Sequence, residues 1–207
     1  MIWTNKELKE KVTFEKIVAM WLKDEWHYPF YDGRRQLIPE KIINNPDISS
    51  LEENKIRLEL LIANRGGIID KLPKNIEWHI TDFRKEDIDR IFLIPMRNGW
   101  VSKMTKGSCK LIDSLNEENW NMESKEHIDR IKEMELSIDA GKINDKLVFI
   151  ASGISSPLTC IEGNHRLIAL TLKALKEKNM DIILEEVYLG ISPSMKDCLL
   201  NAEKYFF

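Results

Sequence analysis

The spacing of apolar side chains in the first third of the chain predicts helices. Over residues 5–26 they recur at mostly helical spacing, so this segment is predicted to be one amphipathic helix with Thr4 as its N-cap. A second helix is predicted to begin at Ser50, which forms a capping-box pattern with Glu53, and to stop at the pair Gly66-Gly67. The start of the chain is therefore expected to be helical.

The segment between these two helices is rich in residues that interrupt helices. Proline lacks a backbone N–H and glycine is conformationally free, so a long helix is not expected here. The interrupting residues are Pro29, Gly33, Pro39 and Pro46. We predict a loop that contains at most a short helix, at residues 40–44. Residues 1–74 are therefore expected to form an N-terminal helical extension.

From about Ile76 the pattern changes to one typical of strands. Two short segments, at 76–81 and 90–95, are rich in β-branched and aromatic residues, which favour strands. Residues 97–123 show weak periodicity and several polar clusters, so an irregular excursion is expected there. The chain thus changes its structural class after the helical extension.

The last part of the chain alternates between helical and strand patterns. In chain order the predicted elements are a helix at 124–141, strands at 146–152 and 158–163, a helix at 165–179, a strand at 182–191, and a terminal helix that starts at Ser192-Pro193 and runs through Tyr205. Residues 75–207 are therefore expected to form an α+β domain, with a mixed sheet and packed helices.

Composition narrows the classes of function. The 31 Lys and Arg residues against 34 Asp and Glu residues leave a net charge of −3, so no global positive charge attracts nucleic acid or anionic lipid. No apolar run approaches the length of a membrane span, and the first residues lack the apolar core of a signal peptide. We expect a cytoplasmic protein that does not act at a membrane.

The three cysteines also argue against particular chemistries. Cys109, Cys160 and Cys198 are odd in number, widely spaced and without a C-x-x-C pair. This pattern favours neither a disulfide framework nor a cysteine zinc site. Three reduced thiols in or near the core are expected.

The most informative sequence is the predicted corner between a strand and a helix at Glu162-Gly163-Asn164-His165-Arg166. Glycine allows a close backbone approach, and the first N–H groups of a helix have no intrahelical partners. His165 and Arg166 add cationic or hydrogen-donating side chains suited to phosphate oxygens. An arginine in the first helical turn opposes the helix dipole unless an anion binds. The corner is therefore a candidate anion site.

A purely structural interpretation of the corner stays open. In that interpretation Asn164 caps the helix, while His165 and Arg166 pair with local carboxylates such as Glu162. Helix capping needs only one of these polar residues. Spacing alone does not decide between the two interpretations.

A family resemblance favours the phosphate interpretation. The order of helix, strand, turn, strand and acid-Gly-x-His-Arg motif resembles the ParB/sulfiredoxin-like superfamily. The similarity covers residues 124–178 clearly and 76–192 loosely. The matching residues are Ser137-Ile138-Asp139-Ala140-Gly141, Leu147 to Ile150, Glu162 to Arg166, and Ala169. This resemblance implies a ParB/sulfiredoxin-like fold, and a phosphate-binding role for Gly163, His165 and Arg166.

Departures from the family pattern select among its branches. Sulfiredoxin chemistry needs a cysteine where this chain has Asn164, and a partition protein would need more than the roughly 30 residues that follow the motif helix. The motif looks closest to the free serine kinase-like branch, with Glu162 in place of the usual aspartate and Asn164 in place of the first histidine.

The resemblance predicts a nucleotide-dependent enzyme that performs phosphoryl transfer or nucleoside triphosphate hydrolysis. Glu162 and His165 are the candidate catalytic residues, and Glu162 is the candidate ligand for Mg²⁺ bound with ATP, ADP or CTP. The candidate phosphate-binding residues are Gly163, Asn164, His165 and Arg166. The expected partners are a nucleotide and a small-molecule acceptor.

Two other functions remain open. A ParB-like DNA-binding or nuclease protein would contact backbone phosphate with His165 and Arg166, although the acidic net charge and the lack of a recognisable helix-turn-helix argue against nucleic acid. A non-catalytic interaction domain would keep the fold without turnover. The sequence leaves the oligomeric state open.

The remaining polar candidates are weaker. The irregular segment carries basic residues, which are expected either to close over phosphates or to be solvated. Its other candidate residues are expected either to form a lid or base-stacking surface or to anchor the loop. The basic residues are Arg97, Lys103, Lys106 and Lys110, and the others are Asn98, Gly99 and Trp100. His27 is expected to be structural. His79 and His127 have no ligand-spaced partner, so neither predicts a metal site.

Overall fold

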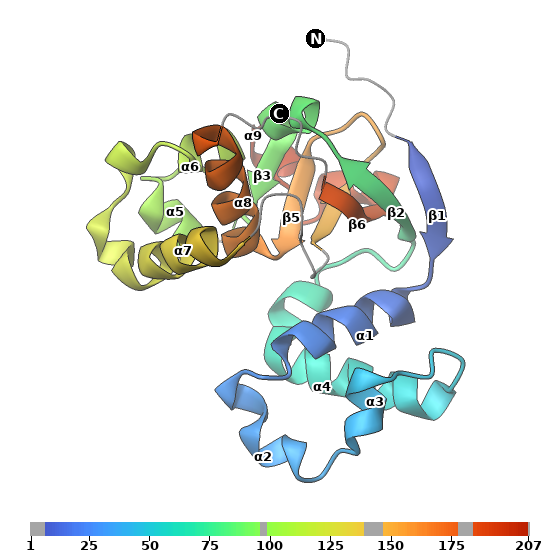
Figure 1. Cartoon of the computed structure of the whole chain (residues 1–207). Helices are drawn as coiled ribbons and strands as arrows, with labels where there is room; N and C mark the ends of the chain where they lie inside the picture. Colours follow the sequence, from blue (N-terminus) through green and yellow to red (C-terminus); the bar gives the residue numbers. More distant parts are fainter. Residues whose placement is uncertain (1–6, 96–98, 139–146, 178–183, 207) are drawn as a thin grey trace. The chain divides into compact units, whose positions relative to one another are not determined.

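The computed structural model describes residues 7–95, 99–138, 147–177 and 184–206 of the 207-residue chain. These residues form two compact units (Figure 1). One unit is Lys11–Leu72, and the other comprises the described residues of Met1–Glu10 and Pro73–Phe207. Within the described ranges, no helix is both long enough and apolar enough to cross a membrane.

The unit Lys11–Leu72 is built mainly from helices. Its helices are α1 (Phe14–Glu25), the 3₁₀ turn η1 (Pro29–Tyr31), α2 (Asp32–Arg35), α3 (Glu40–Asn44) and α4 (Leu51–Ile69). A small apolar core of Leu22, Tyr31, Ile42 and Ile43 joins α1, η1 and α3. The short helix predicted at residues 40–44 is confirmed.

The predicted helix at residues 5–26 is wrong at its start. Leu8–Val12 forms strand β1, and α1 begins only after Thr13, whose hydroxyl accepts the Lys16 N–H at 3.4 Å. The predicted cap, Thr4, lies outside the described residues. Strand β1 lies at the edge of the sheet beside β2 (Glu77–Phe83), where the Thr81 hydroxyl donates to the Glu7 carbonyl at 2.7 Å. Tertiary pairing therefore overrides the helical periodicity.

The second helix begins as expected and ends later than expected. The Ser50 hydroxyl accepts the Glu53 N–H at 3.3 Å, which confirms the predicted cap. The predicted stop at Gly66-Gly67 is wrong, because α4 continues to Ile69 with a kink at Arg65. Arg65 is bound to the buried carboxylate of Glu25 on α1, which anchors the helix just before the two glycines.

The second unit contains a six-stranded mixed sheet in the order β1-β2-β6-β4-β5-β3. Its further strands are β3 (Ile91–Leu93), β4 (Val148–Ala151), β5 (Leu158–Glu162) and β6 (Leu184–Ile191). Strand β6 is antiparallel to β2 and parallel to β4, while β5 is antiparallel to β4 and parallel to β3. The predicted strands at 76–81, 90–95, 146–152, 158–163 and 182–191 are confirmed within these bounds.

Two long helices of this unit position the candidate site. Helix α7 (Lys125–Ser137) packs against α8 (Asn164–Lys176), and both contribute to a core shared with the sheet. The α8 face toward this core includes Leu167, Ile168 and Leu172. Gly141, the predicted end of the first helix, lies outside the described residues. The expected α+β class, with a mixed sheet and packed helices, is confirmed.

Two other segments are built from short, separate elements. Residues 97–123 contain the short helices α5 (Trp100–Met104) and α6 (Leu111–Ser114) and the 3₁₀ turn η3 (Glu117–Asn119), followed by η4 (Met122–Ser124). The predicted terminal helix is wrong, because η5 (Pro193–Asp197) and α9 (Glu203–Phe206) are separate. Between them, buried Asn201 donates to the Met195 carbonyl at 2.9 Å and interrupts the helix. As expected, all three cysteines are buried thiols that form no disulfide.

Candidate functional site

The motif corner lies where β5 ends and α8 begins. Gly163 has φ +88°, in the left-handed region that strains other residues. A Cβ atom at this position would lie 2.2 Å from Leu147 Cδ2 and 3.2 Å from Arg166 Nη2. The corner therefore requires glycine for two reasons, its backbone conformation and the closeness of its neighbours.

Asn164 connects the corner to the neighbouring strand. It is the first helical residue, and the N-cap position belongs to Gly163, which makes no side-chain capping bond. The buried Asn164 Oδ1 accepts the N–H of Ile94, just beyond β3, at 3.1 Å. The capping role that the structural interpretation gave Asn164 is therefore wrong. Its side chain holds α8 against the end of β3.

Arg166 and Glu162 face each other across the corner. Arg166 Nη2 lies 3.4 Å from Glu162 Oε1, and both side chains are mostly buried. This is the local pairing that the structural interpretation expected. A separation of 3.4 Å is longer than the 2.7–2.9 Å typical of a strong charge-assisted bond. The pair balances charge at the corner without a tight bond.

His165 lies in a cluster of three rings from three helices, which we call the histidine–tryptophan cluster: Trp100, His127 and His165. His165 Nε2 lies 3.0 Å from His127 Nδ1. The Trp100 ring stacks on His165 with centroids 4.0 Å apart and on His127 with centroids 4.8 Å apart. Helices α5, α7 and α8 each contribute one ring, so the cluster exists only because they pack together.

Burial keeps both histidines uncharged. It lowers the pKa of His165 from 6.5 to about 3, and the positive charges of Arg130 and Arg166 act in the same direction. Burial also lowers the pKa of His127, although Glu126 opposes the shift. At neutral pH one imidazole N–H therefore donates to the other ring's nitrogen. Of the two roles expected for His165, hydrogen bonding fits this environment and a permanent positive charge does not.

The partner of His127 is a finding that sequence reasoning missed. The two histidines lie 38 residues apart, so no local spacing reveals the pair. The described residues contain no group of three or more His, Cys, Asp or Glu side chains arranged to hold a metal ion.

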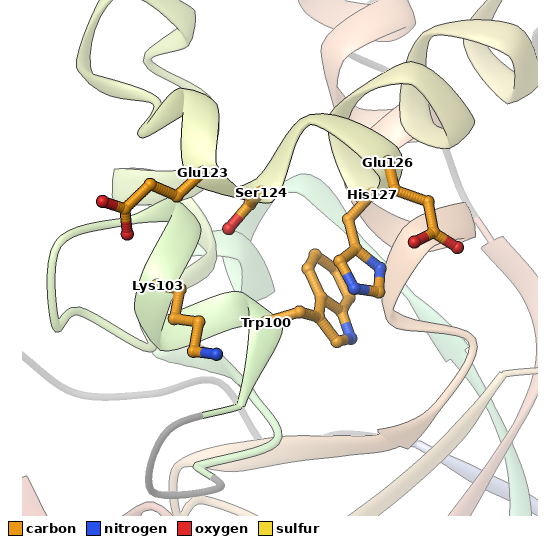
Figure 2. A pocket seen from close by; sticks show the side chains of 6 residues that line it. All are labelled: Trp100, Lys103, Glu123, Ser124, Glu126 and His127. Carbon is orange, nitrogen blue, oxygen red and sulfur yellow. The ribbon is translucent and has the colours of Figure 1, made fainter.

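A pocket of about 320 Å³ adjoins the cluster at the start of α7 (Figure 2). Its walls come from α5, η4 and α7, and the lining residues are Trp100, Lys103, Glu123, Ser124, Glu126 and His127. Figure 2 shows the Ser124 hydroxyl pointing toward the space between Lys103 and Trp100. The buried Ser124 Oγ has no hydrogen-bond partner among the described residues. Ser124 also escaped the sequence analysis, because a serine beside a helix is expected to cap it.

The irregular segment contributes to this pocket only in part. Lys103 and Trp100 line it, while Lys106 and Lys110 are exposed elsewhere on the segment. Arg97 and Asn98 lie outside the described residues, and Gly99 is the N-cap of α5. Trp100 is partly buried and packs against the main core, as the anchoring alternative predicts.

Comparisons with known proteins add no relative. Searches against protein-family models, curated proteins and solved structures give no match to this chain. The resemblance to the ParB/sulfiredoxin-like superfamily therefore depends on the motif residues alone.

Proposed function

We propose that the α+β domain has a ParB/sulfiredoxin-like fold and binds a nucleotide at the Glu162–Arg166 corner, where it transfers or hydrolyses the terminal phosphoryl group. The observation that carries the proposal is the left-handed Gly163 at the start of the 13-residue helix α8, with no side-chain cap. The unpaired N–H groups of such a helix start favour phosphate oxygens.

Arg166 is the proposed phosphate-binding side chain. It lies in the first turn of α8, and its guanidinium can contact phosphate oxygens in a bidentate way. In the free protein Glu162 balances its charge through the 3.4 Å contact. A phosphate that replaces this contact would release Glu162 to act as a carboxylate toward the reacting groups.

Glu162 is the proposed base or metal ligand, and His165 has a supporting role. A pKa of about 3 makes His165 a weak base, whereas its hydrogen bond with His127 suits it to orient the corner. Asn164 uses its side chain to hold Ile94, so its backbone N–H is the group available to a phosphate.

The donor set at the corner fits Mg²⁺ only when the ion arrives with a nucleotide. Glu162 is one carboxylate, and Mg²⁺ in phosphoryl-transfer sites uses one or two carboxylates together with phosphate oxygens and water. When bound, the ion would supply charge neutralisation at the phosphates. Glu162 would hold it, while Arg166 and the α8 N–H groups would hold the phosphates.

The first test is a thermal-shift and calorimetric titration with ATP, ADP, CTP and GTP, each with Mg²⁺. We expect at least one nucleotide to stabilise the wild type, by about 2.7 kcal/mol at one hundred times its dissociation constant. Arg166→Gln should lose this response. Lys173→Gln, which removes one positive charge near the other end of α8, should retain it.

Two results would contradict the proposal. One is a lack of response of the wild type to every nucleotide, and the other is an equal response of Arg166→Gln and wild type. Titration with duplex and single-stranded DNA would then test the ParB-like nucleic-acid alternative, which predicts binding that weakens steeply with salt.

A further inference from the structure

The buried hydroxyl of Ser124 differs from those of the other buried serines in the described chain. Ser114 Oγ donates to the Leu111 carbonyl at 2.6 Å, Ser152 Oγ donates to Ser156 Oγ at 2.8 Å, and Ser192 Oγ donates to Asn75 Oδ1 at 3.1 Å. Ser124 is 4% exposed, and its Oγ has no hydrogen-bond partner in the part of the chain that the structure describes. An unsatisfied buried polar group destabilises a fold, so this hydroxyl points to a ligand.

The position of Ser124 adds further donors to the same space. Ser124 is the N-cap of α7, a helix of 13 residues, and its side chain makes no capping bond. The Lys125 N–H already donates to the Met122 carbonyl of η4, so it is the later N–H groups of the first turn, together with the helix dipole, that favour negative charge there. The hydroxyl lines the pocket beside these groups (Figure 2). This end of α7 is therefore suited to an oxyanion.

The charged side chains of the pocket restrict the ligand further. The Lys103 ammonium has no ion pair with another described residue, whereas the carboxylates of Glu123 and Glu126 stand at the same pocket. Two carboxylates disfavour a bare polyanion. They favour an anion whose neighbouring groups donate hydrogen bonds, as hydroxyl groups do.

We propose that this pocket binds a small phosphate monoester that carries hydroxyl groups. A tetrahedral phosphate presents three oxygens, enough for Ser124 Oγ–H, Lys103 Nζ and the start of α7 at once, whereas a carboxylate presents two. The hydroxyl groups of the ligand donate to Glu123 and Glu126. The roughly 320 Å³ volume lies at the small end of ligand sites, which selects a compact ligand over a whole nucleotide.

This second site goes beyond nucleotide turnover at the corner and uses different side chains. The corner uses Gly163 and Arg166, and the pocket uses Ser124 and Lys103. The two are adjacent through His127, which lines the pocket and contacts His165 at 3.0 Å. A ligand in the pocket therefore lies close to His165, which belongs to the corner motif.

Calorimetric titration of the full chain tests the assignment. We expect glycerol 3-phosphate or ribose 5-phosphate to bind, and the neutral polyols glycerol and ribose not to bind. Ser124→Ala should weaken binding about tenfold or more, since it removes a hydrogen bond to a charged group. Lys103→Met should weaken it similarly, and Lys106→Met, a matched change at an exposed lysine outside the pocket, should not.

Several outcomes would overturn the proposal. They are failure of both phosphate esters to bind, binding that Ser124→Ala and Lys103→Met leave unchanged, and preferential binding of glycerate, which would indicate a hydroxycarboxylate site. Inorganic phosphate that binds as tightly as the esters would also contradict the role of Glu123 and Glu126.

The nucleotide titration separates this proposal from the first one. Ser124→Ala should keep the thermal response to nucleotide that Arg166→Gln loses. If no nucleotide binds but the phosphate esters do, the corner proposal fails while the pocket assignment stands. Unfolding curves of each variant verify that a loss of binding is not a loss of fold.

Discussion

Two buried polar side chains, Arg57 in one unit and Ser124 in the other, differ in how completely they are hydrogen-bonded. In Lys11–Leu72 the fully buried Arg57 donates to the carbonyls of Ile42 and Asp47 at 3.0 and 2.9 Å, and leaves only its Nε without a partner. In the described residues of the α+β unit the buried Ser124 hydroxyl has no hydrogen-bond partner, and His165 is kept neutral by burial. Buried polar groups whose hydrogen bonds are made within the protein (saturated groups) hold a fold together. Buried polar groups without such bonds can still bond a ligand.

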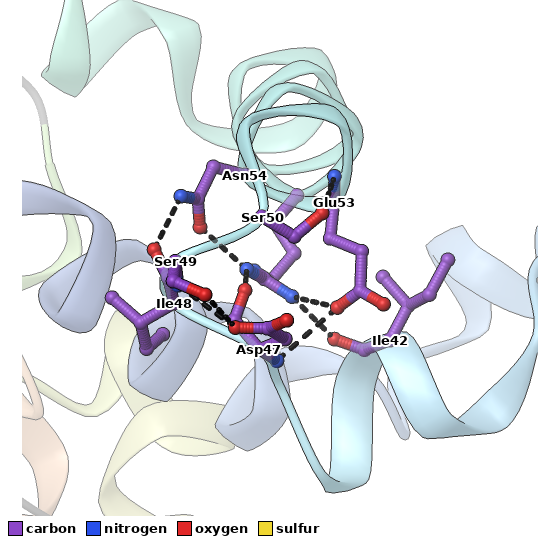
Figure 3. Close-up of polar contacts among 8 residues, drawn as sticks. Ile42, Asp47, Ile48, Ser49, Ser50, Glu53 and Asn54 are labelled. Carbon is purple, nitrogen blue, oxygen red and sulfur yellow. Dashed lines mark hydrogen bonds and ion pairs between the residues drawn. The ribbon is translucent and has the colours of Figure 1, made fainter.

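The saturated network around Arg57 joins α3, the following loop and α4 (Figure 3). Arg57 Nη1 also lies 3.0 Å from Glu53 Oε2, and the same carboxylate oxygen accepts the Asp47 N–H at 3.2 Å. Glu25 in this unit is similarly engaged, by Trp21 Nε1 at 3.1 Å and Asn64 Nδ2 at 2.8 Å. We infer that both charged groups serve structure.

The largest expected effect tests the hydrogen-bonded network around Arg57. Arg57→Met removes the buried cation that pairs with Glu53 and leaves two carbonyls without this donor, so we expect a loss of about 3–5 kcal/mol of stability in this unit. Hydrogen exchange across α4 and chemical denaturation measure it. Lys55→Met, at a side chain 77% exposed on the same helix, should change stability by under about 0.5 kcal/mol. Equal effects would contradict the structural role of Arg57.

A backbone change at the candidate site comes next in size. Gly163→Ala combines left-handed strain with an overlap on Leu147, so we expect a loss of about 3 kcal/mol, measured by thermal and chemical unfolding. Gly107→Ala is the matched control, because Gly107 has φ +104° but nothing within 4 Å of the added Cβ. Its expected loss is about 1 kcal/mol. A cost for Gly163→Ala no greater than the control would argue against the close contact.

The neutral His165 makes stability depend on pH. Its pKa is about 3 in the folded chain against an ordinary 6.5, so between these values the unfolded chain binds more protons and stability falls as the pH falls. We expect this group to contribute a loss of about 3 kcal/mol between pH 7 and pH 4.

Comparison with His165→Gln isolates this contribution from other acid-sensitive groups. The variant should show a flatter fall of unfolding free energy over pH 7 to 4. His27→Gln, a control at an exposed histidine of the other unit, should follow the wild-type curve. Parallel curves for His165→Gln and wild type would show that His165 is not held neutral.

The smallest effect concerns two buried serines. Ser114→Ala removes a satisfied hydroxyl and leaves the Leu111 carbonyl without this donor, so we expect a loss of about 1 kcal/mol. Ser124→Ala removes an unsatisfied hydroxyl and should leave stability unchanged or raise it slightly. Chemical denaturation of both variants measures the difference. Similar losses would indicate that the Ser124 hydroxyl has a structural partner.

Local chemistry was enough to predict several elements. The β-branched and aromatic segments predicted β2 and β3, the Ser50 pattern predicted the start of α4, and the Glu162–Arg166 motif predicted a glycine corner between a strand and a helix. Each of these signals depends on residues within a few positions of one another. Phosphate binding at the corner stays a prediction.

The wrong predictions have in common that contacts between distant segments decided the structure. Residues 8–12 have a helical spacing but pair as an edge strand, and Gly66-Gly67 continues a helix that Arg65 anchors to Glu25. In both places a contact with a distant segment outweighs a local preference of at most about 1 kcal/mol per residue. Such contacts cannot be derived from neighbouring residues.

The sequence by itself determined the α+β class of this protein, its main strands and its glycine corner, because hydrophobic periodicity and turn chemistry act over a few residues. Only the tertiary structure decided that His127 meets His165, that Trp100 stacks on both, and that Ser124 is buried with no hydrogen-bond partner among the residues described. These features depend on the packing of α5, α7 and α8, and burial and hydrogen bonding across such distances are properties of the folded chain.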